Sequence, residues 1–125
     1  MSSGPVGDLA GMLAGMAPVL DARRWSFALV VEGDTPPPEA FAMIREDEGT
    51  TAIMPDDGGA FARITLTVHS ALDGVGLTAA VATALAQQGI ACNVVAGFHH
   101  DHLFVPWERR GEALEVLQRL AATAA

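Results

Sequence analysis

The chain has 125 residues, half of them hydrophobic, with a formal net charge of −8 and no lysine. This length supports one compact domain, or two half-size units that share a core. The scarcity of basic side chains argues against nucleic acid and anionic membranes as partners, because both are bound mainly through positive charge.

Nothing in the sequence predicts export or insertion into a membrane. No apolar run approaches the roughly 20 residues that cross a bilayer. Residues 1–8 lack the basic start and the apolar block of a secretion signal. Cys92 is the one cysteine, so an internal disulfide cannot form. We therefore expect a cytoplasmic protein.

The first half of the chain is strand-rich and acidic. Residues 32–57 carry eight carboxylates against one base, Arg45. A solvated rim is the ordinary interpretation of this run, and a cation site is the alternative. The predicted elements are, in chain order, a helix over residues 8–17, a strand over 25–31, a proline-rich break over 33–38, a hairpin from 40–45 and 50–54 that turns at a Gly49 with positive φ, and a linker over 56–59.

The second half is more regular. Residues 63–69 alternate apolar and polar side chains, which is typical of a half-buried strand. Gly89 follows an alanine-rich stretch and suits the residue just beyond a helix end. The predicted elements are a strand over 63–69, a glycine-bearing turn over 70–76, a helix over 75–88, a hairpin from 91–98 and 103–105 turning at 99–102, and a helix over 107–122 that buries Ala113, Leu117, Leu120 and Ala121.

The two halves share a pattern of apolar strand followed by hairpin and proline, at a spacing of roughly 50 residues. In the first copy, the crossover helix has shrunk to the triple-proline loop. The second copy gives β-α-β-β-α and lacks the fourth strand of a ferredoxin-like unit. We expect a strand of the first half, or of another chain, to complete it. The predicted fold is therefore α+β and ferredoxin-like, with a degenerate unit over residues 1–59 and a fuller unit over 60–125.

Residues 69–78 and 93–106 resemble a small bacterial group of tandem ACT-like proteins, and the resemblance extends from about Leu9 to Leu120. It implies a β-α-β-β-α-β fold and binding of amino acids or related small molecules. In ACT domains the ligand lies at the turn between the first strand and the first helix, against the second strand of a neighbouring domain. That turn is residues 70–76 here, and the second strand contains Asn93, Val94 and Val95. The first copy lacks the turn, so the resemblance implies one site.

A turn of this kind leaves helix N–H groups unpaired and suits a carboxylate or phosphate. Missing side chains at Gly74 and Gly76 allow a ligand to reach the amides, or only satisfy turn geometry. Asp73 is either the cap of the following helix or a contact for an ammonium group. A buried Asn93 faces local backbone or a polar ligand. The predicted ligand-binding residues are His69, Ser70, Asp73, Gly74, Val75, Gly76, Leu77, Asn93 and Val94.

Four polar residues, 99–102, allow a metal hypothesis, because His100 and His102 share a face of a strand. A hydrogen-bonded hairpin tip, with Asp101 as a turn residue, is the competing interpretation. Cys92 lacks a neighbouring base, and no catalytic triad or phosphate loop occurs. We expect no catalytic residues, no metal and no cofactor.

The sequence thus predicts a regulatory or sensor module that binds a small molecule, with an amino acid as the expected ligand. It is expected to act through association of domains or subunits, as a homo-oligomer such as a dimer. The alternative is a protein–protein interaction module without a ligand, using a sheet edge or the hairpin of residues 99–102.

Overall fold

One six-stranded antiparallel sheet, in the order β2-β3-β1-β4-β6-β5, organises the computed structural model, which describes residues 4–124. The strands are β1 (Pro18–Val30), β2 (Ala42–Glu46), β3 (Gly49–Pro55), β4 (Phe61–Leu66), β5 (Asn93–Ala96) and β6 (Asp101–Pro106). The helices are α1 (Leu9–Ala14), α2 (Leu77–Gln87) and α3 (Arg110–Ala124), the last preceded by the 3₁₀ turn η1 (Trp107–Arg109). Among the described residues, no helix is both long and apolar enough to span a bilayer.

The sheet is built from two similar halves that exchange strands. The first half contributes β1-β3-β2 and the second contributes β4-β6-β5, and β1 pairs with β4 at the centre. β1 therefore occupies the place of the fourth strand that a ferredoxin-like second half lacks. The prediction of a tandem fold, with a degenerate first copy that shares strands with the second, is confirmed.

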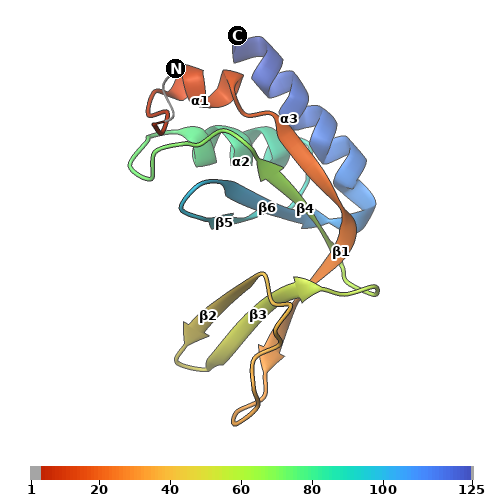
Figure 1. Cartoon of the computed structure of the whole chain (residues 1–125). Helices are drawn as coiled ribbons and strands as arrows, with labels where there is room; N and C mark the ends of the chain where they lie inside the picture. Colours follow the sequence, from red (N-terminus) through yellow and green to blue (C-terminus); the bar gives the residue numbers. More distant parts are fainter. Residues whose placement is uncertain (1–3, 125) are drawn as a thin grey trace.

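β1 is much longer than the predicted strand, with 13 residues. Its first part pairs with β4 and its second part with β3, and the register shifts between Leu20 and Arg24. The charged residues near this bulge interrupt the alternation, which is why the sequence pattern indicated only the second part. A bulge bends a strand. The bend carries residues 25–30, β2 and β3 away as an arm, which Figure 1 shows below the rest of the molecule.

The main core lies between the helices and one face of β4, β6 and β5 (Figure 1). β4 alternates Ala62, Ile64 and Leu66, all buried, with partly exposed residues, as a strand covered on one face must. α2 contributes Leu77, Val81 and Leu85, the stripe expected from the sequence. α3 buries Ala113 and Leu117 as predicted, whereas Leu120 and Ala121 are only partly buried.

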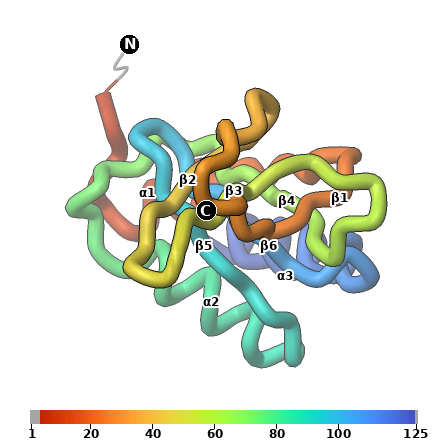
Figure 2. The backbone as a smooth tube through the Cα atoms, turned by 90° about the horizontal axis from the view of Figure 1, so that it is seen from below, coloured from red at the N-terminus to blue at the C-terminus, as the bar shows by residue number. Residues whose placement is uncertain are grey.

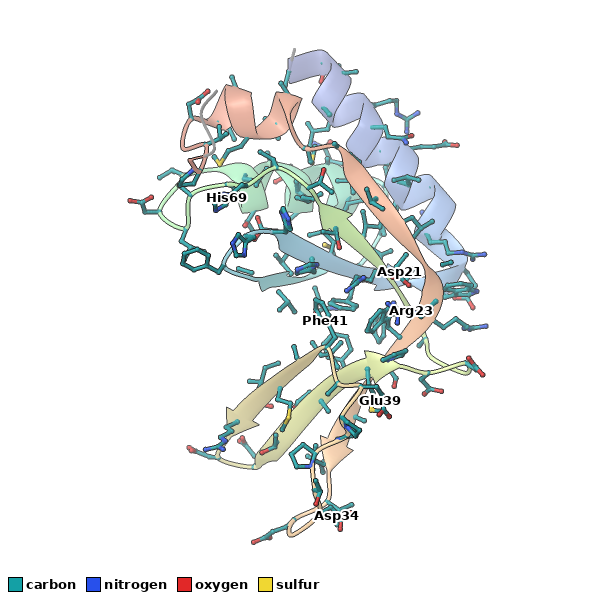
Figure 3. The ribbon with its side chains drawn as sticks, in the orientation of Figure 1. Asp21, Arg23, Asp34, Glu39, Phe41 and His69 are labelled. Carbon is teal, nitrogen blue, oxygen red and sulfur yellow. The ribbon has the colours of Figure 1, made fainter. Side chains whose placement is uncertain are left out.

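A second, aromatic cluster fills the opposite, helix-free face and holds the arm against the sheet. Trp25 packs edge to face on Phe41 and Phe104, with ring centroids 5.6 and 6.1 Å apart. The Arg63 guanidinium lies 4.6 Å from the ring centroids of both Trp25 and Phe41. It also forms a 3.0 Å salt bridge with Asp21, at the bend of β1. Figure 3 shows Phe41 pointing from the arm toward the main sheet.

The turns and helix ends follow the sequence at several points. Gly49 has φ +148° in the β2–β3 turn, and Gly89 has φ +70° just past the end of α2, both as expected. Asp8 caps α1 by accepting a 2.8 Å hydrogen bond from the Gly11 amide. Residues 56–59, predicted as a linker, are a tight turn between β3 and β4 of one sheet. The division into units of residues 1–59 and 60–125 stays a prediction.

Candidate functional site

The loop between β4 and α2, residues 67–76, is held from outside by the N-terminal segment. The Val6 amide donates a 2.7 Å hydrogen bond to the His69 carbonyl, and the Ala71 amide donates one of 2.8 Å to the Val6 carbonyl. Figure 2 shows this segment running beside the loop. These two backbone hydrogen bonds fix the loop to a part of the chain that lies about sixty residues earlier in the sequence.

Two glycines of the loop pack directly under α1. Gly76 has φ +103°, and a Cβ there would lie 3.2 Å from Leu9 Cδ2. A Cβ on Gly74 would lie 3.0 Å from the sulfur of Met12. The positive φ favours glycine at position 76, and at both positions a Cβ would press against a side chain of α1. The structure thus favours turn geometry and packing as the main reason for these glycines.

The N-terminus of α2 has no side-chain cap. The helix begins at Leu77, and its N-cap residue is Gly76, which makes no side-chain hydrogen bond. Of the two interpretations of Asp73, the helix cap was wrong, because the helix starts two residues later than its apolar pattern indicated. Uncapped amides and the helix dipole leave a partial positive charge at this end.

A small cavity of about 90 Å³ opens beside this uncapped end. It lies between α1, the loop, the first turn of α2 and the facing ends of β5 and β6. Its lining residues are Met12, Ser70, Ala71, Leu72, Gly74, Leu77, Thr78, Ala96 and Asp101.

Asp101 places a carboxylate in the same cavity. It is the first residue of β6, where it pairs with Leu66 of β4 and with Ala96 of β5. Burial raises the pKa of Asp101, while the Ser70 side chain and the charge of His100 act in the opposite direction. The cavity therefore contains one negative group and one positive helix end, which are the complements of an ammonium and a carboxylate.

A second, more open hollow of about 200 Å³ shares the residues 70–72 with the cavity. His69, Asp73 and Phe98 contribute to its lining, together with Pro5. Phe98 is 72% exposed, and Leu72 is 69% exposed, so the hollow has an apolar rim. Because the two hollows share lining residues, they lie next to each other.

The structure brings only some of the predicted site residues together. Ser70, Gly74 and Leu77 line the cavity, and His69, Ser70 and Asp73 line the outer hollow. Val75 points into solvent and is 82% exposed, while Gly76 contributes its backbone under Leu9.

Asn93 and Val94 lie away from the turn. Asn93 pairs with Phe104, at the opposite end of the β5–β6 ladder from Ala96 and Asp101. Asn93 is also exposed, so the expectation of a buried asparagine was wrong. The first residue of an edge strand has an open side, and an exposed amide there is solvated.

The histidines near the β5–β6 turn have separate protein partners. His102 Nδ1 lies 2.9 Å from Thr65 Oγ1, and its ring packs on Phe41 with centroids 4.7 Å apart. His100 Nδ1 lies 3.4 Å from the Val68 carbonyl oxygen. Within residues 4–124, no three His, Cys, Asp or Glu side chains gather to hold a metal ion, which goes against both the metal hypothesis for the histidines and the cation hypothesis for the acidic run.

Cys92 is half-buried, and burial raises the pKa of its thiol to about 11. At neutral pH the side chain is a protonated thiol, a poor nucleophile.

Asp101 is the residue of the site that the sequence reasoning missed. It was interpreted as a turn residue, because the strand was expected to begin at residue 103. Pairing the end of the residue 63–69 strand with its antiparallel neighbour would have placed residue 101 at the turn. Met12 carried no such signal, because the packing of α1 over the loop is a tertiary contact between distant segments.

Comparison with known proteins agrees with this architecture. Two family models, both described as ACT domain, match residues 63–119 and 5–69. The second match spans more than half of the chain. The chain belongs to the ACT domain family. A comparison with curated proteins finds no match.

Three solved structures are similar. A protein of unknown function from Vibrio cholerae, described as a possible transport protein, is 40% identical over 85% of this chain and 89% of its own, with a TM-score of 0.73. A protein from Agrobacterium tumefaciens is 19% identical over 78% and 82%, with a TM-score of 0.61. The ligand-free regulatory subunit of aspartate kinase from Thermus thermophilus is 12% identical over 85% and 97%, with a TM-score of 0.63. The last two show likeness of fold.

ACT domains are regulatory modules rather than catalytic ones, and they generally bind small molecules, often amino acids. They also commonly dimerise. The resemblance expected from residues 69–78 and 93–106 is therefore confirmed at the level of the family.

Proposed function

We propose that this chain is a non-catalytic, cytoplasmic sensor that binds a small amino-acid-like zwitterion at the β4–α2 turn. The observation that carries the proposal is the cavity that holds both the uncapped start of α2 and the carboxylate of Asp101. The ligand carboxylate would accept hydrogen bonds from the amides of Leu77 and Thr78, and its ammonium group would pair with Asp101.

Burial of Asp101 favours this assignment. The raised pKa means that the charged form of this carboxyl group lacks full compensation inside the protein. A bound ammonium group would supply the missing charge. Such a group gains more from a partly buried carboxylate than from an exposed one, because the local dielectric is lower.

Four other predicted residues contact different parts of the ligand in this proposal. Ser70 and Gly74 contact the ligand in the cavity. His69 and Asp73 face its side chain in the outer hollow. The cavity of about 90 Å³ suits the common part of an amino acid, so the outer hollow is the part that selects among side chains.

Association of two copies would use the free edge of β5. This strand pairs with β6 on one side, and its other side ends the sheet. Its outward N–H and C=O groups can pair with the same strand of a second copy, which would extend the sheet. Ala96 of β5 lines the cavity, so ligand binding and edge pairing would share this strand.

The test is isothermal titration calorimetry of the full chain against each proteinogenic amino acid. We expect saturable binding of at least one of them. Asp101→Asn should weaken it by about tenfold or more, since a charged hydrogen bond contributes roughly 1.5–3 kcal/mol.

Asp57→Asn is the matched control, because Asp57 is exposed in the β3–β4 turn and lines neither the cavity nor the hollow. It should leave binding unchanged. Gly76→Val is unsuitable as a test, because φ +103° and the contact with Leu9 would disturb folding. Folded protein that binds no amino acid contradicts the proposal.

A further inference from the structure

The first half of the chain has lost the helix that covers the second half. On the central strands, Arg24 of β1 pairs with Ala62, which is buried under the helices. Alternation along β1 then places Ala28 and Val30 on this helix-bearing face of the sheet. Over the second half, α2 covers this face. Over the arm, residues 31–41 contain three prolines and no helix, and Figure 1 shows all three α-helices lying away from β2 and β3.

A groove of about 710 Å³ lies on this face toward the far end of the arm, beyond Ala52, which is itself fully buried. Val30, Met43 and Thr50 of the three arm strands line it, and Val31 and Pro36 line it from the loop. Val31 is 65% exposed, and Met43 is 42% exposed. Large apolar side chains that line a hollow together are typical of an interaction site rather than of ordinary protein surface.

The rim of the groove is strongly acidic. Glu32 and Asp34 approach it from the loop, and Asp47 and Glu48 approach it from the β2–β3 turn. All four are exposed, and none forms a salt bridge in the described part of the chain. Arg45 is the one base that lines the groove. Figure 3 shows Asp34 at the far end of the arm.

We propose that this groove docks an amphipathic helix of another protein, with an apolar stripe flanked by lysine or arginine. A helix is the element that the equivalent face of the second half carries, and an apolar floor receives its apolar stripe. The acidic rim selects basic flanks and repels acidic ones. A second copy of this chain is the disfavoured occupant, because it carries a net charge of −8 and no lysine.

The test uses a fluorescently labelled synthetic peptide designed as an amphipathic helix, with leucines on one face and lysines on both flanks. Its binding to the full chain is measured by fluorescence anisotropy. We expect saturable binding that weakens about tenfold in the double variant Val31→Ser, Met43→Ser, since exposed anchors of a docking groove contribute most of its affinity. Neutralising the rim with Asp47→Asn and Glu48→Gln should weaken binding several-fold and reduce its dependence on salt.

Val75→Ser is the matched control, because Val75 is 82% exposed in the β4–α2 turn and lies outside the groove. It should leave the affinity unchanged. A peptide with glutamate in place of lysine should bind at least tenfold more weakly. Circular dichroism checks that each variant is folded. Three results overturn the proposal: no binding of the lysine peptide, equal binding by the groove variants, or self-association of the chain that the groove substitutions abolish. This inference stands whether or not the β4–α2 turn binds a ligand.

Discussion

At the residue scale, the ionised side chain of Asp101 affects stability and ligand binding in opposite directions. Its carboxylate is partly buried, and burial raises its pKa. A group whose folded pKa is raised makes the protein less stable once it is ionised, so its ionised form costs stability at neutral pH. A residue that costs stability where an alternative side chain would not is typical of a functional site.

Asp101→Asn should therefore raise or preserve the free energy of unfolding at pH 7 while it weakens ligand binding. The neutral amide keeps the shape of the side chain and removes the desolvated charge. Urea unfolding at pH 7 and at pH 3 measures the first effect, and the gain should shrink at pH 3, where the native carboxyl is protonated as well. A loss of stability at pH 7 larger than at pH 3 would contradict this account of Asp101.

His102 gives the fold a pH dependence near neutrality. Burial, the charge of Arg63 and the charge of His100 lower its pKa. The folded protein thus resists protonation of this ring more than the unfolded chain does. The contribution of the neutral His102 ring to the free energy of unfolding is fully present above the ordinary histidine pKa of about 6.5. It is lost as the pH falls through and below that value.

We expect the free energy of unfolding of the wild type to fall more between pH 7.5 and pH 5.5 than that of His102→Asn. Asn keeps a hydrogen-bonding group near Thr65 without titrating. Urea titrations at both pH values measure the difference. If the free energy of unfolding falls equally in the two proteins over this pH range, His102 is not the source of the pH dependence.

At the element scale, the arm is attached by the aromatic cluster and by the salt bridge at the bend of β1. Phe104 is fully buried against Trp25 and Phe41 on the helix-free face. Leu29 lies farther along the same strand as Trp25 and is 71% exposed. The arm is thus anchored at its base and free at its tip.

Phe104→Ala should destabilise the protein by about 3–5 kcal/mol, because it removes the centre of the cluster and leaves a cavity. Leu29→Ala should change the free energy of unfolding by less than about 0.5 kcal/mol, since that side chain is already in water. Chemical denaturation followed by tryptophan fluorescence compares the two. Similar effects at both positions would mean that the arm is not anchored at this cluster.

The bend of β1 depends on Asp21, which bridges Arg23 and Arg63. Hydrogen bonds from Arg23 and the charges of both arginines lower the pKa of Asp21 to about 2, against the opposing effect of burial. A lowered carboxyl pKa stabilises the fold above the ordinary value, and this contribution is lost as the pH falls through about 2. Asp21→Asn should cost roughly 1 kcal/mol at pH 7. The cost should be much smaller near pH 2, as measured by thermal unfolding, and an equal cost at both pH values would show that charge is not the cause.

Much of the fold could be predicted from local sequence, and the rest depends on distant contacts. The alternation in β4 and the stripe of α2 are local, and both were found. The start of α2 was misplaced because Asp73 is a good cap by composition, whereas the glycine at position 76 is set by its packing under Leu9. The length of β1 was missed because Asp21 and Arg23 are charged, and the burial of Asp21 becomes favourable only through its salt bridge with Arg63 of another strand.

The candidate site could likewise be predicted only in part from the sequence. The turn of residues 70–76 was predicted as a glycine-bearing link between strand and helix, and in the structure this link begins at residue 67. Asp101 was not, because its place depends on how β6 pairs with β4. Asn93 was expected to face a turn from a neighbouring domain, and within this chain the register places it at the opposite end of the β5–β6 ladder from Asp101.

At the scale of the whole molecule, the two halves of the fold present different surfaces. The second half keeps its crossover helix and, beside it, the cavity with Asp101. The first half keeps its strands, lends β1 to the second, and carries a groove at the far end of the arm.

The central claim is that the free amides at the start of α2 and the carboxylate of Asp101 together receive a zwitterion. Nuclear magnetic resonance of the ¹⁵N-labelled full chain tests this most directly, with the amino acid that calorimetry identifies as the tightest binder added stepwise. We predict that the largest amide shifts fall on Leu77, Thr78 and Asp101, and that Asp101→Asn suppresses them. Saturable shifts confined to other parts of the chain, with these three amides unmoved, would contradict the account.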